Sequence, residues 1–248
     1  MHLTLVLESE SSVWDVPVHY NGLVQGALYR NLTPEFGEFL HNQGFVSDGR
    51  RFALFAFSRL LGDSEYIAET KTLRFRNPVR LIVASPVERF IRETGRLLLR
   101  EGVRLGKQLL RVAAVELDAP RVESASVEVE ALSPVVAYST MYRSDGRKFT
   151  AYFQPQETDF QRIVADNLVR KAKLLYGEDA EFGPIRVTPV GRPRKQVVIY
   201  KDTIIEGYTG RFRLEGDVRL IQTAIDAGLG GKNSSGFGLV REVGENSS

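Results

Sequence analysis

The chain has 248 residues, which is enough for one large domain or two domains of about 120 residues each. It contains no cysteine, so disulfides, thiolate metal sites and cysteine nucleophiles are excluded. The 33 Lys and Arg residues against 31 Asp and Glu residues leave a formal charge of +2, which is not typical of a nonspecific nucleic-acid coat. Three scattered histidines without HExxH spacing argue against a zinc site, so we expect no metal and no cofactor.

The first half of the chain predicts the order strand, helix, strand, strand, helix, strand. The expected elements are a strand at 3–7, a helix with Leu23, Val24, Ala27, Leu28 and Leu32 on one face, a helical piece from Thr33-Pro34, a strand at 52–60, a hairpin around 66–76, a strand at 79–84, a helix from Val87 and a strand at 109–117. No basic leader precedes the first strand, and no apolar run of about 18 residues follows it. We therefore expect a soluble, cytoplasmic protein with no membrane partner.

The second half is expected to repeat this order. Its elements are a strand at 127–131, a strand ending at Tyr142, a turn at 143–148, a strand at 149–153, a helix from Phe160 to Leu175, a β-hairpin at 197–214 turning at Glu206-Gly207, a helix from Val218, a glycine-rich loop and a strand at 237–243. Two βαββαβ units in series predict an α+β fold of two tandem ferredoxin-like, RRM-like domains. We place these domains at 1–118 and 122–248.

The glycine-rich loop at 228–240 joins the last expected helix to the last expected strand. Two Gly-x-Gly units flank five small, polar or basic residues, and this composition frees the backbone and offers N–H groups to an anion. A dinucleotide-binding fingerprint requires the reverse order of strand, glycines and helix, and a Walker loop requires a glycine where Asp226 stands. Residues 235–240 match the RRM consensus only in part. A glycine-rich corner without a ligand is the alternative.

Positive charge gathers between Arg186 and Arg213, where seven basic residues face only Asp202 and Glu206. A basic surface confined to one region suits a polyanion bound in a groove. Within this region, the run 192–195 is either a solvated turn or a segment that grips RNA.

Candidate chemistry lies in the first half, where Tyr29, His41 and the pair Arg50-Arg51 bring a phenol, an imidazole and guanidiniums into a short stretch. The ordinary pKa of histidine, near 6.5, suits general acid and base catalysis at neutral pH. A surface histidine at a helix end and an aromatic residue at the edge of the core are the structural alternatives. His19, at the start of the first helix, is the competing histidine.

The two units Gly228-Leu229-Gly230 and Gly236-Phe237-Gly238 resemble, in spacing and chain position, the glycine-rich loop of CRISPR-associated endoribonucleases of the RAMP superfamily. These enzymes cut precursor CRISPR RNA within its repeats. Tyr29-Arg30 and the stretches 40–45 and 55–58 also resemble the N-terminal pattern of this family. The tandem ferredoxin-like arrangement extends the resemblance over the whole chain.

The resemblance implies metal-independent cleavage, in which the 2′-hydroxyl of the RNA attacks the adjacent phosphate and leaves 2′,3′-cyclic phosphate and 5′-hydroxyl ends. It implies that His41 is the general acid and base and that Tyr29 orients the nucleophile or leaving group. Family members often carry a lysine where this chain has Ala53. Arg51 is expected to supply the missing positive charge, with Arg50 or another basic residue left open.

The expected partner is CRISPR repeat RNA, with effector-complex subunits and a second copy of the chain as further candidates. The residues expected to bind RNA are Arg192, Arg194, Lys195, Gly228, Gly230, Lys232, Asn233, Ser234, Gly236 and Gly238. Two alternatives remain open. One is a noncatalytic RNA-binding RAMP subunit, which the absence of the lysine at Ala53 favours. The other is a metabolite-binding ferredoxin-like regulator, which would not need the basic region.

Overall fold

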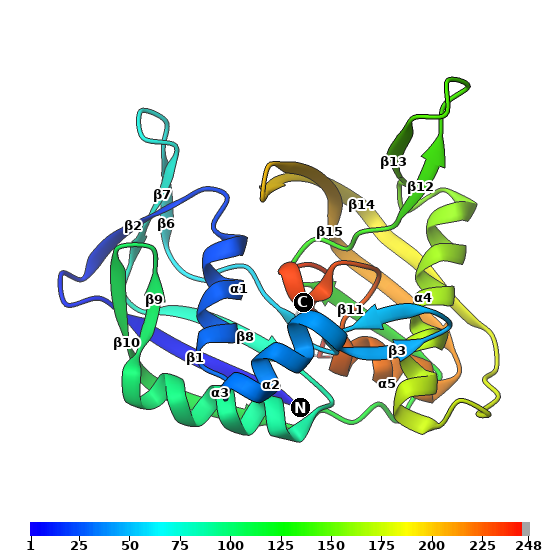
Figure 1. The fold of residues 1–248 in the computed structure, drawn as a ribbon, viewed down its shortest axis with the longest axis horizontal. Coiled ribbons are helices and arrows are strands. Elements are labelled where there is room, and N and C mark those ends of the chain that lie inside the picture. The colour runs from blue at the N-terminus through cyan, green and yellow to red at the C-terminus, as the bar shows by residue number, and fades with distance from the viewer. Residues whose placement is uncertain (245–248) are drawn as a thin grey trace.

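Apolar alternation in the first strand organises the first half of the chain in the computed structural model, which describes residues 1–244. Leu3, Leu5 and Leu7 are all buried on one face of β1, and the helices α1 and α3 pack over this face (Figure 1). The antiparallel sheet has the order β5-β8-β1-β10-β9. Its elements are β1 (His2–Glu8), α1 (Asn21–Arg30), α2 (Pro34–Glu38), β5 (Ala56–Phe57), β8 (Val79–Ala84), α3 (Glu88–Glu101), β9 (Val103–Leu105) and β10 (Gln108–Asp118).

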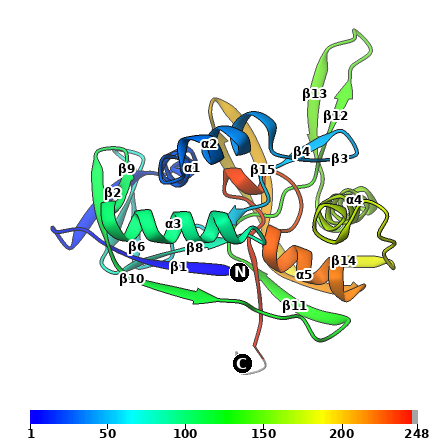
Figure 2. The ribbon, with the colours of Figure 1, turned by 60° about the horizontal axis from the view of Figure 1, so that its bottom comes forward.

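The second half forms another antiparallel sheet with the order β14-β15-β11-β16. Two amphipathic helices, α4 and α5, pack with this sheet around a core that contains Phe160, Leu168, Phe212 and Ile221. A separate hairpin, β12–β13, projects from the body beside α4 (Figure 2). The elements are β11 (Ser126–Ala131), β12 (Tyr138–Tyr142), β13 (Lys148–Tyr152), α4 (Thr158–Tyr176), β14 (Ile185–Tyr200), β15 (Thr203–Gly216), α5 (Val218–Ala227) and β16 (Val240–Glu242).

Both sheets have the strand order of a ferredoxin-like unit, because the first strand of each lies between the third and the last strands of its βαββαβ series. The predicted α+β fold of two tandem ferredoxin-like units, with a C-terminal glycine-rich loop, is confirmed. The domain limits 1–118 and 122–248 remain a prediction, and residues 245–248 of the second unit lie outside the described part. Among residues 1–244, no helix is long and apolar enough to cross a bilayer.

The first half also contains small elements that the sequence did not predict. One is a three-stranded sheet of β2 (Val13–Pro17), β6 (Ser64–Ile67) and β7 (Thr72–Arg76), of which only the β6–β7 hairpin was expected. Another is the hairpin of β3 (Phe45–Ser47) and β4 (Arg50–Phe52), which follows a π-helical turn at Phe39–Gln43. This turn and hairpin carry several candidate site residues.

The expected strand at 52–60 is largely wrong. Phe52 ends the short strand β4, and only Ala56 and Phe57 join the first sheet, as its edge strand β5. Leu54 has a φ of 51°, which interrupts the extended chain. Phe55, Phe57 and Leu60 are buried in the core of the first half, whereas Ala56 packs with Leu132 and Leu239 of the second half. The amide of Arg59 also donates to the carbonyl of Leu132 at 2.9 Å.

The hairpin turn expected at Glu206-Gly207 is also misplaced. Tyr200 pairs with Thr203, so the turn is at Lys201-Asp202, where both residues have positive φ. Gly207 lies inside β15 instead, and a side chain there would meet Pro134. The glycine therefore permits the close approach of a neighbouring segment.

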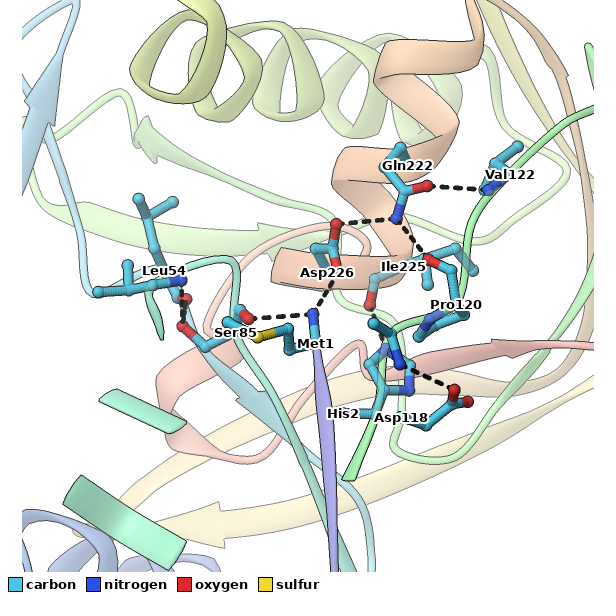
Figure 3. Close-up of polar contacts among 12 residues, drawn as sticks. Met1, His2, Leu54, Ser85, Asp118, Pro120, Val122, Gln222, Ile225 and Asp226 are labelled. Carbon is cyan, nitrogen blue, oxygen red and sulfur yellow. Dashed lines mark hydrogen bonds and ion pairs between the residues drawn. The ribbon is translucent and has the colours of Figure 1, made fainter. Parts of the chain in front are cut away.

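Polar contacts of α5 with the first strand and with the segment that connects the halves tie the two halves together (Figure 3). His2 Nε2 donates to the carbonyl of Ile225 at 2.9 Å. The amide of Gln222 donates to the carbonyl of Pro120 at 3.0 Å and accepts from the backbone of Val122 at 2.9 Å. Since α5 contributes both Gln222 and Ile225, this helix fixes the first strand and the connecting segment against the second half.

Candidate active site between the two halves

His41 lies at the centre of the π-helical turn Phe39–Gln43. The turn is closed by the amide of Gly44, which donates to the carbonyl of Phe39 at 2.7 Å. Gly44 has a φ of 62° and lies so close to Phe52 that a Cβ atom would contact its carbonyl. The glycine thus lets the chain leave the turn directly into β3, and π-helical turns of this kind are frequent at functional sites.

Tyr29, in the last turn of α1, meets His41 edge to face, with 6.2 Å between the ring centroids. The Tyr29 ring also packs edge to face with Phe55, at 5.8 Å between centroids. Burial, with a smaller contribution from Tyr200, raises the pKa of Tyr29 to about 12. The phenol is therefore neutral at physiological pH and can donate a hydrogen bond.

Positive charge reaches this pair from both halves. Arg51 Nη1 donates to the carbonyl of Asn42 at 2.8 Å, which holds the guanidinium beside the π-helical turn. Lys201 comes from the β14–β15 turn and lines the same cavity as His41 and Arg51. Arg50 does not line this cavity, although it lines a neighbouring cleft.

The cavity has a volume of about 230 Å³ and lies where the two halves meet. Gln25, one turn before Tyr29 on α1, connects its walls: the amide Nε2 donates to the carbonyl of Ser234 at 2.8 Å, and Oε1 accepts from the hydroxyl of Tyr200. The lining residues are Gln25, Tyr29, Leu40, His41, Gln43, Gly44, Arg51, Phe52, Ala53, Tyr200, Lys201 and Ser234. Ala53 thus lines the cavity without offering a charge.

The four glycines of the two Gly-x-Gly units in the glycine-rich loop pack against the protein itself. Gly228, Gly230, Gly236 and Gly238 all have positive φ, and a Cβ atom on any of them would come within 3.0 Å of another residue of the chain. For Gly236 these neighbours include Phe57 in the first half. The space beside these glycines is therefore filled, and their binding of RNA stays a prediction.

A buried lysine of α4, Lys171, holds the loop in place. Its ammonium donates to the carbonyls of Gly228 and Gly230 at 2.7 and 3.1 Å and to Asn233 Oδ1 at 2.6 Å. The Asn233 amide in turn donates to the carbonyl of Phe237 at 3.1 Å. Burial lowers the pKa of Lys171 to about 7. The helical spacing that places Lys171 on the apolar face of α4 was visible in the sequence, but its role was not.

The basic run Arg192, Arg194 and Lys195 lies within β14 and away from the cavity. The pairing of β14 with β15 shifts between Val190 and Arg194, so Arg192 lies in an irregular, exposed part of the strand. Lys195 forms an ion pair with Glu206 at 2.7 Å. Arg192 and Arg194 take part in no ion pair within residues 1–244. Their exposed charges remain available to a polyanion.

The described part of the chain has no group of three or more His, Cys, Asp or Glu side chains placed to hold a metal ion. The cavity instead combines an imidazole, a neutral phenol and two cations. These groups can exchange a proton and stabilise a developing negative charge.

A model of the family "CRISPR associated protein Cas6, C-terminal" matches residues 117–242, just over half of the chain. The chain belongs to the Cas6 family. The family resemblance inferred from the glycine-rich loop and the N-terminal pattern is thereby confirmed. The Cas6 match covers the second ferredoxin-like sheet, including β14, β15 and the loop.

Other comparisons extend the Cas6 likeness over the whole chain. "CRISPR-associated endoribonuclease Cas6 1" of Methanocaldococcus jannaschii is 25% identical over 255 residues, covering 98% of this chain and 93% of the relative. A solved structure of a Cas6-related protein from Pyrococcus furiosus has a TM-score of 0.86 at 18% identity and covers 99% of each chain. A second, described as an RAMP protein binding different RNA substrates, has a TM-score of 0.82 at 15% identity, covering 98% of this chain and all of the other.

Proposed function

We propose that the chain is an endoribonuclease that cuts precursor CRISPR RNA within its repeats. The observation that carries the proposal is the meeting of Tyr29, His41 and a cationic side chain in one cavity of a Cas6 family member. The full-length likeness to a relative named as a CRISPR-associated endoribonuclease supports the substrate class. The likeness to an RNA-binding RAMP protein supports repeat RNA as the partner.

The proposed reaction is a transesterification that needs no metal. The 2′-hydroxyl oxygen forms a bond to the adjacent phosphorus, and the bond from phosphorus to the 5′-oxygen of the next nucleotide breaks. One proton leaves the 2′-hydroxyl and one joins the departing 5′-oxygen, so the products are a 2′,3′-cyclic phosphate and a 5′-hydroxyl. Only RNA carries the attacking group.

His41 is the proposed general acid and base, since an imidazole exchanges protons near neutral pH. The neutral phenol of Tyr29 would orient the nucleophile or leaving group by donating a hydrogen bond, which its raised pKa favours. Arg51 and Lys201 are the candidates for stabilising the charge that builds up on the phosphate. A guanidinium does not give up its proton at neutral pH, so the role proposed for Arg51 is electrostatic.

Cleavage of the cognate repeat RNA in EDTA, beside a copy with a 2′-deoxy substitution at the cut site, tests this proposal. We expect the unmodified RNA to be cut to cyclic-phosphate ends and the 2′-deoxy copy to remain intact. Dependence on added divalent metal, or cutting of the 2′-deoxy copy, would contradict the mechanism.

A noncatalytic RNA-binding subunit is the second candidate, and Ala53 at the position where relatives often carry lysine is the observation that favours it. Its signature in the same assay would be tight binding of both RNAs without cutting of either. That outcome would replace the enzyme assignment.

A further inference from the structure

The tip of the β14–β15 hairpin reaches from the second half of the chain to α1 of the first half (Figure 1). Its outer face is open to solvent, since Val197, Ile199 and Ile204 are 50%, 44% and 59% exposed. Its inner face packs on a small apolar cluster of the second half, and the hydroxyl of Tyr152 donates to the carbonyl of Ile204 at 3.0 Å. The second half therefore supports the tip on one side only, and its place beside α1 depends on contacts with the first half.

Two hydrogen bonds within residues 1–244 fasten the tip to the first half. The backbone amide of Ile199 donates to His19 Nδ1 at 3.2 Å, and the hydroxyl of Tyr200 donates to Gln25 Oε1. The Tyr200 ring also lies beside Gly22 of α1, where an added Cβ atom would be 3.9 Å from it. Of the two hydrogen-bond partners, Gln25 lines the candidate cavity and His19 does not. The contact with Gln25 is therefore the one that fixes the tip at the site.

Gln25 connects three elements through its one amide group. It lies on α1, one helical turn before Tyr29. While Oε1 accepts from Tyr200, Nε2 donates to the carbonyl of Ser234 in the glycine-rich loop at 2.8 Å. Both polar atoms of the side chain are thus engaged by the protein, so we expect Gln25 to act through its neighbours and not on the RNA.

The neighbour that matters for the chemistry is Lys201, which directly follows Tyr200. Its ammonium lies 5.5 Å from the centroid of the Tyr200 ring, and the residue lines the cavity together with His41. A lysine ammonium ends a flexible stem of four carbons, so its reach depends on where the backbone is held. Arg51 differs, because the carbonyl of Asn42 holds its guanidinium within the first half. Of these two cations, Lys201 is the one whose position depends on a contact between the halves.

We propose that Gln25 is a positioning residue that assembles the site from the two halves. Its hydrogen bond with Tyr200 holds Lys201 beside Tyr29 and His41, so that the lysine contributes to stabilising the charge of the transition state. The inference rests on the proposed RNA-cutting function and adds the contact that brings one of its cations into place. Misplacing a group by about 1 Å can cost about 10²-fold in rate, so loss of this contact should slow cleavage.

The first test compares the unaltered protein with Gln25→Met, which keeps the length of the side chain and removes both hydrogen bonds. Single-turnover cleavage of the cognate repeat RNA is measured with the protein in saturating excess. We expect the rate constant to fall about 10-fold to 10²-fold. The Kd for the 2′-deoxy RNA should stay nearly unchanged. Under these conditions a partly unfolded preparation would still cut at the normal rate, so a lower rate constant reports on the site itself.

Double variants show whether Gln25 acts through the hairpin tip. Tyr200→Phe breaks the same hydrogen bond from its other end, so it should slow cleavage as well and add little to the loss in Gln25→Met. In the Lys201→Ala protein, Gln25→Met should cause almost no further loss. In the Arg51→Ala protein it should keep its full effect.

Gln222→Met is the matched control, because it removes a glutamine that also bonds across segments, to Pro120 and Val122, but lies outside the cavity. We expect it to lower thermal stability and to leave the cleavage rate constant unchanged. Hydrogen exchange of the backbone amides at 198–204 reports on the tip directly. It should be faster in Gln25→Met than in the unaltered protein, and unchanged in Gln222→Met.

A normal rate constant in Gln25→Met would overturn the inference and leave the proposed function standing. A normal rate in Lys201→Ala, or losses that multiply when Gln25→Met is combined with Lys201→Ala, would also overturn it, since Gln25 would then not act through the lysine. Failure of the unaltered protein to cut would instead refute the proposed function and, with it, this role. The two failures are therefore distinguished by the unaltered protein alone.

Discussion

The rings of Tyr29 and His41 meet edge to face at 6.2 Å between centroids, although one lies in the last turn of α1 and the other in a π-helical turn. Phe55 also packs edge to face against Tyr29. The two side chains are therefore held together by packing before any substrate arrives, and this arrangement suits groups that act on one phosphate.

Replacing His41 with alanine is expected to lower the cleavage rate about 10²-fold to 10⁴-fold, the usual contribution of a general acid or base. Affinity for repeat RNA should stay nearly unchanged. Single-turnover cleavage and Kd measurements check both expectations. His19→Asn is a matched control, because this histidine lies outside the cavity and asparagine can still accept from the amide of Ile199. Equal losses in the two variants would argue against a specific role of His41.

Removing the hydroxyl of Tyr29 by Tyr29→Phe is expected to lower the cleavage rate by about tenfold, roughly the loss of one hydrogen bond to a charged group. Because the pKa of Tyr29 is raised to about 12, the phenol keeps its proton throughout pH 6–10. The rate ratio between the two proteins should therefore be constant over this range. A ratio that changes with a midpoint below pH 10 would mean that the phenol ionises in the reaction.

Arg51 and Lys201 are the two candidates for stabilising the negative charge of the transition state. Loss of such a group costs roughly 10²-fold in rate when it acts directly. We expect this loss from Arg51→Ala or from Lys201→Ala, and a larger one from the double variant. Lys107→Ala, which removes an exposed lysine from the β9–β10 turn, controls for a general loss of charge. Single variants that both cut at the normal rate would remove these residues from the mechanism.

The exposed arginines of β14 predict how RNA binding depends on salt concentration. The double variant of Arg192 and Arg194 to alanine should weaken RNA binding and flatten the plot of log K against log salt by about 1.4, if each contacts one phosphate of a single strand. Replacing Arg92 and Arg96, two exposed arginines of α3, provides the matched control. An unchanged slope would place the RNA elsewhere.

The buried Lys171 predicts that stability depends on pH. Its pKa is lowered to about 7 in the folded chain by burial, while an unfolded lysine titrates near 10.4. Between these values the unfolded chain binds the extra proton, so the free energy of unfolding should rise with pH. Below pH 7 the burial penalty is fully present. Urea unfolding at several pH values should show this rise, and Lys171→Met should lack it. If the free energy of unfolding changed with pH equally in the unaltered protein and in Lys171→Met, the lowered pKa of Lys171 would be refuted.

Much of the fold could be predicted from the sequence because apolar periodicity reports burial directly. The helix that became α4 and the first strand β1 were both expected from their spacing. The stretch 52–60 was misread because its apolar residues are buried in two different cores, Phe55 and Phe57 in that of the first half and Ala56 against the second half. Local alternation does not reveal the positive φ of Leu54 that interrupts the strand. The turn at Lys201-Asp202 was missed for a related reason, since Glu206-Gly207 has turn-like residues but sits in a strand.

The candidate site was predictable only in part. Residue types and family resemblance selected Tyr29, His41 and Arg51, and the structure brings these three to one cavity. Lys201 was not selected, because its approach depends on a long hairpin whose turn was misplaced.

The packing of the glycine-rich loop shows that this motif can be kept for folding, independently of catalytic activity. Each of the four glycines in its two Gly-x-Gly units is required by the chain's own neighbouring atoms, so selection on folding alone would preserve the motif in a descendant that had lost its catalytic groups. The glycine-rich motif therefore identifies members of the family but does not show whether they catalyse RNA cleavage. Under the proposed mechanism, cleavage of RNA depends instead on the side chains around His41.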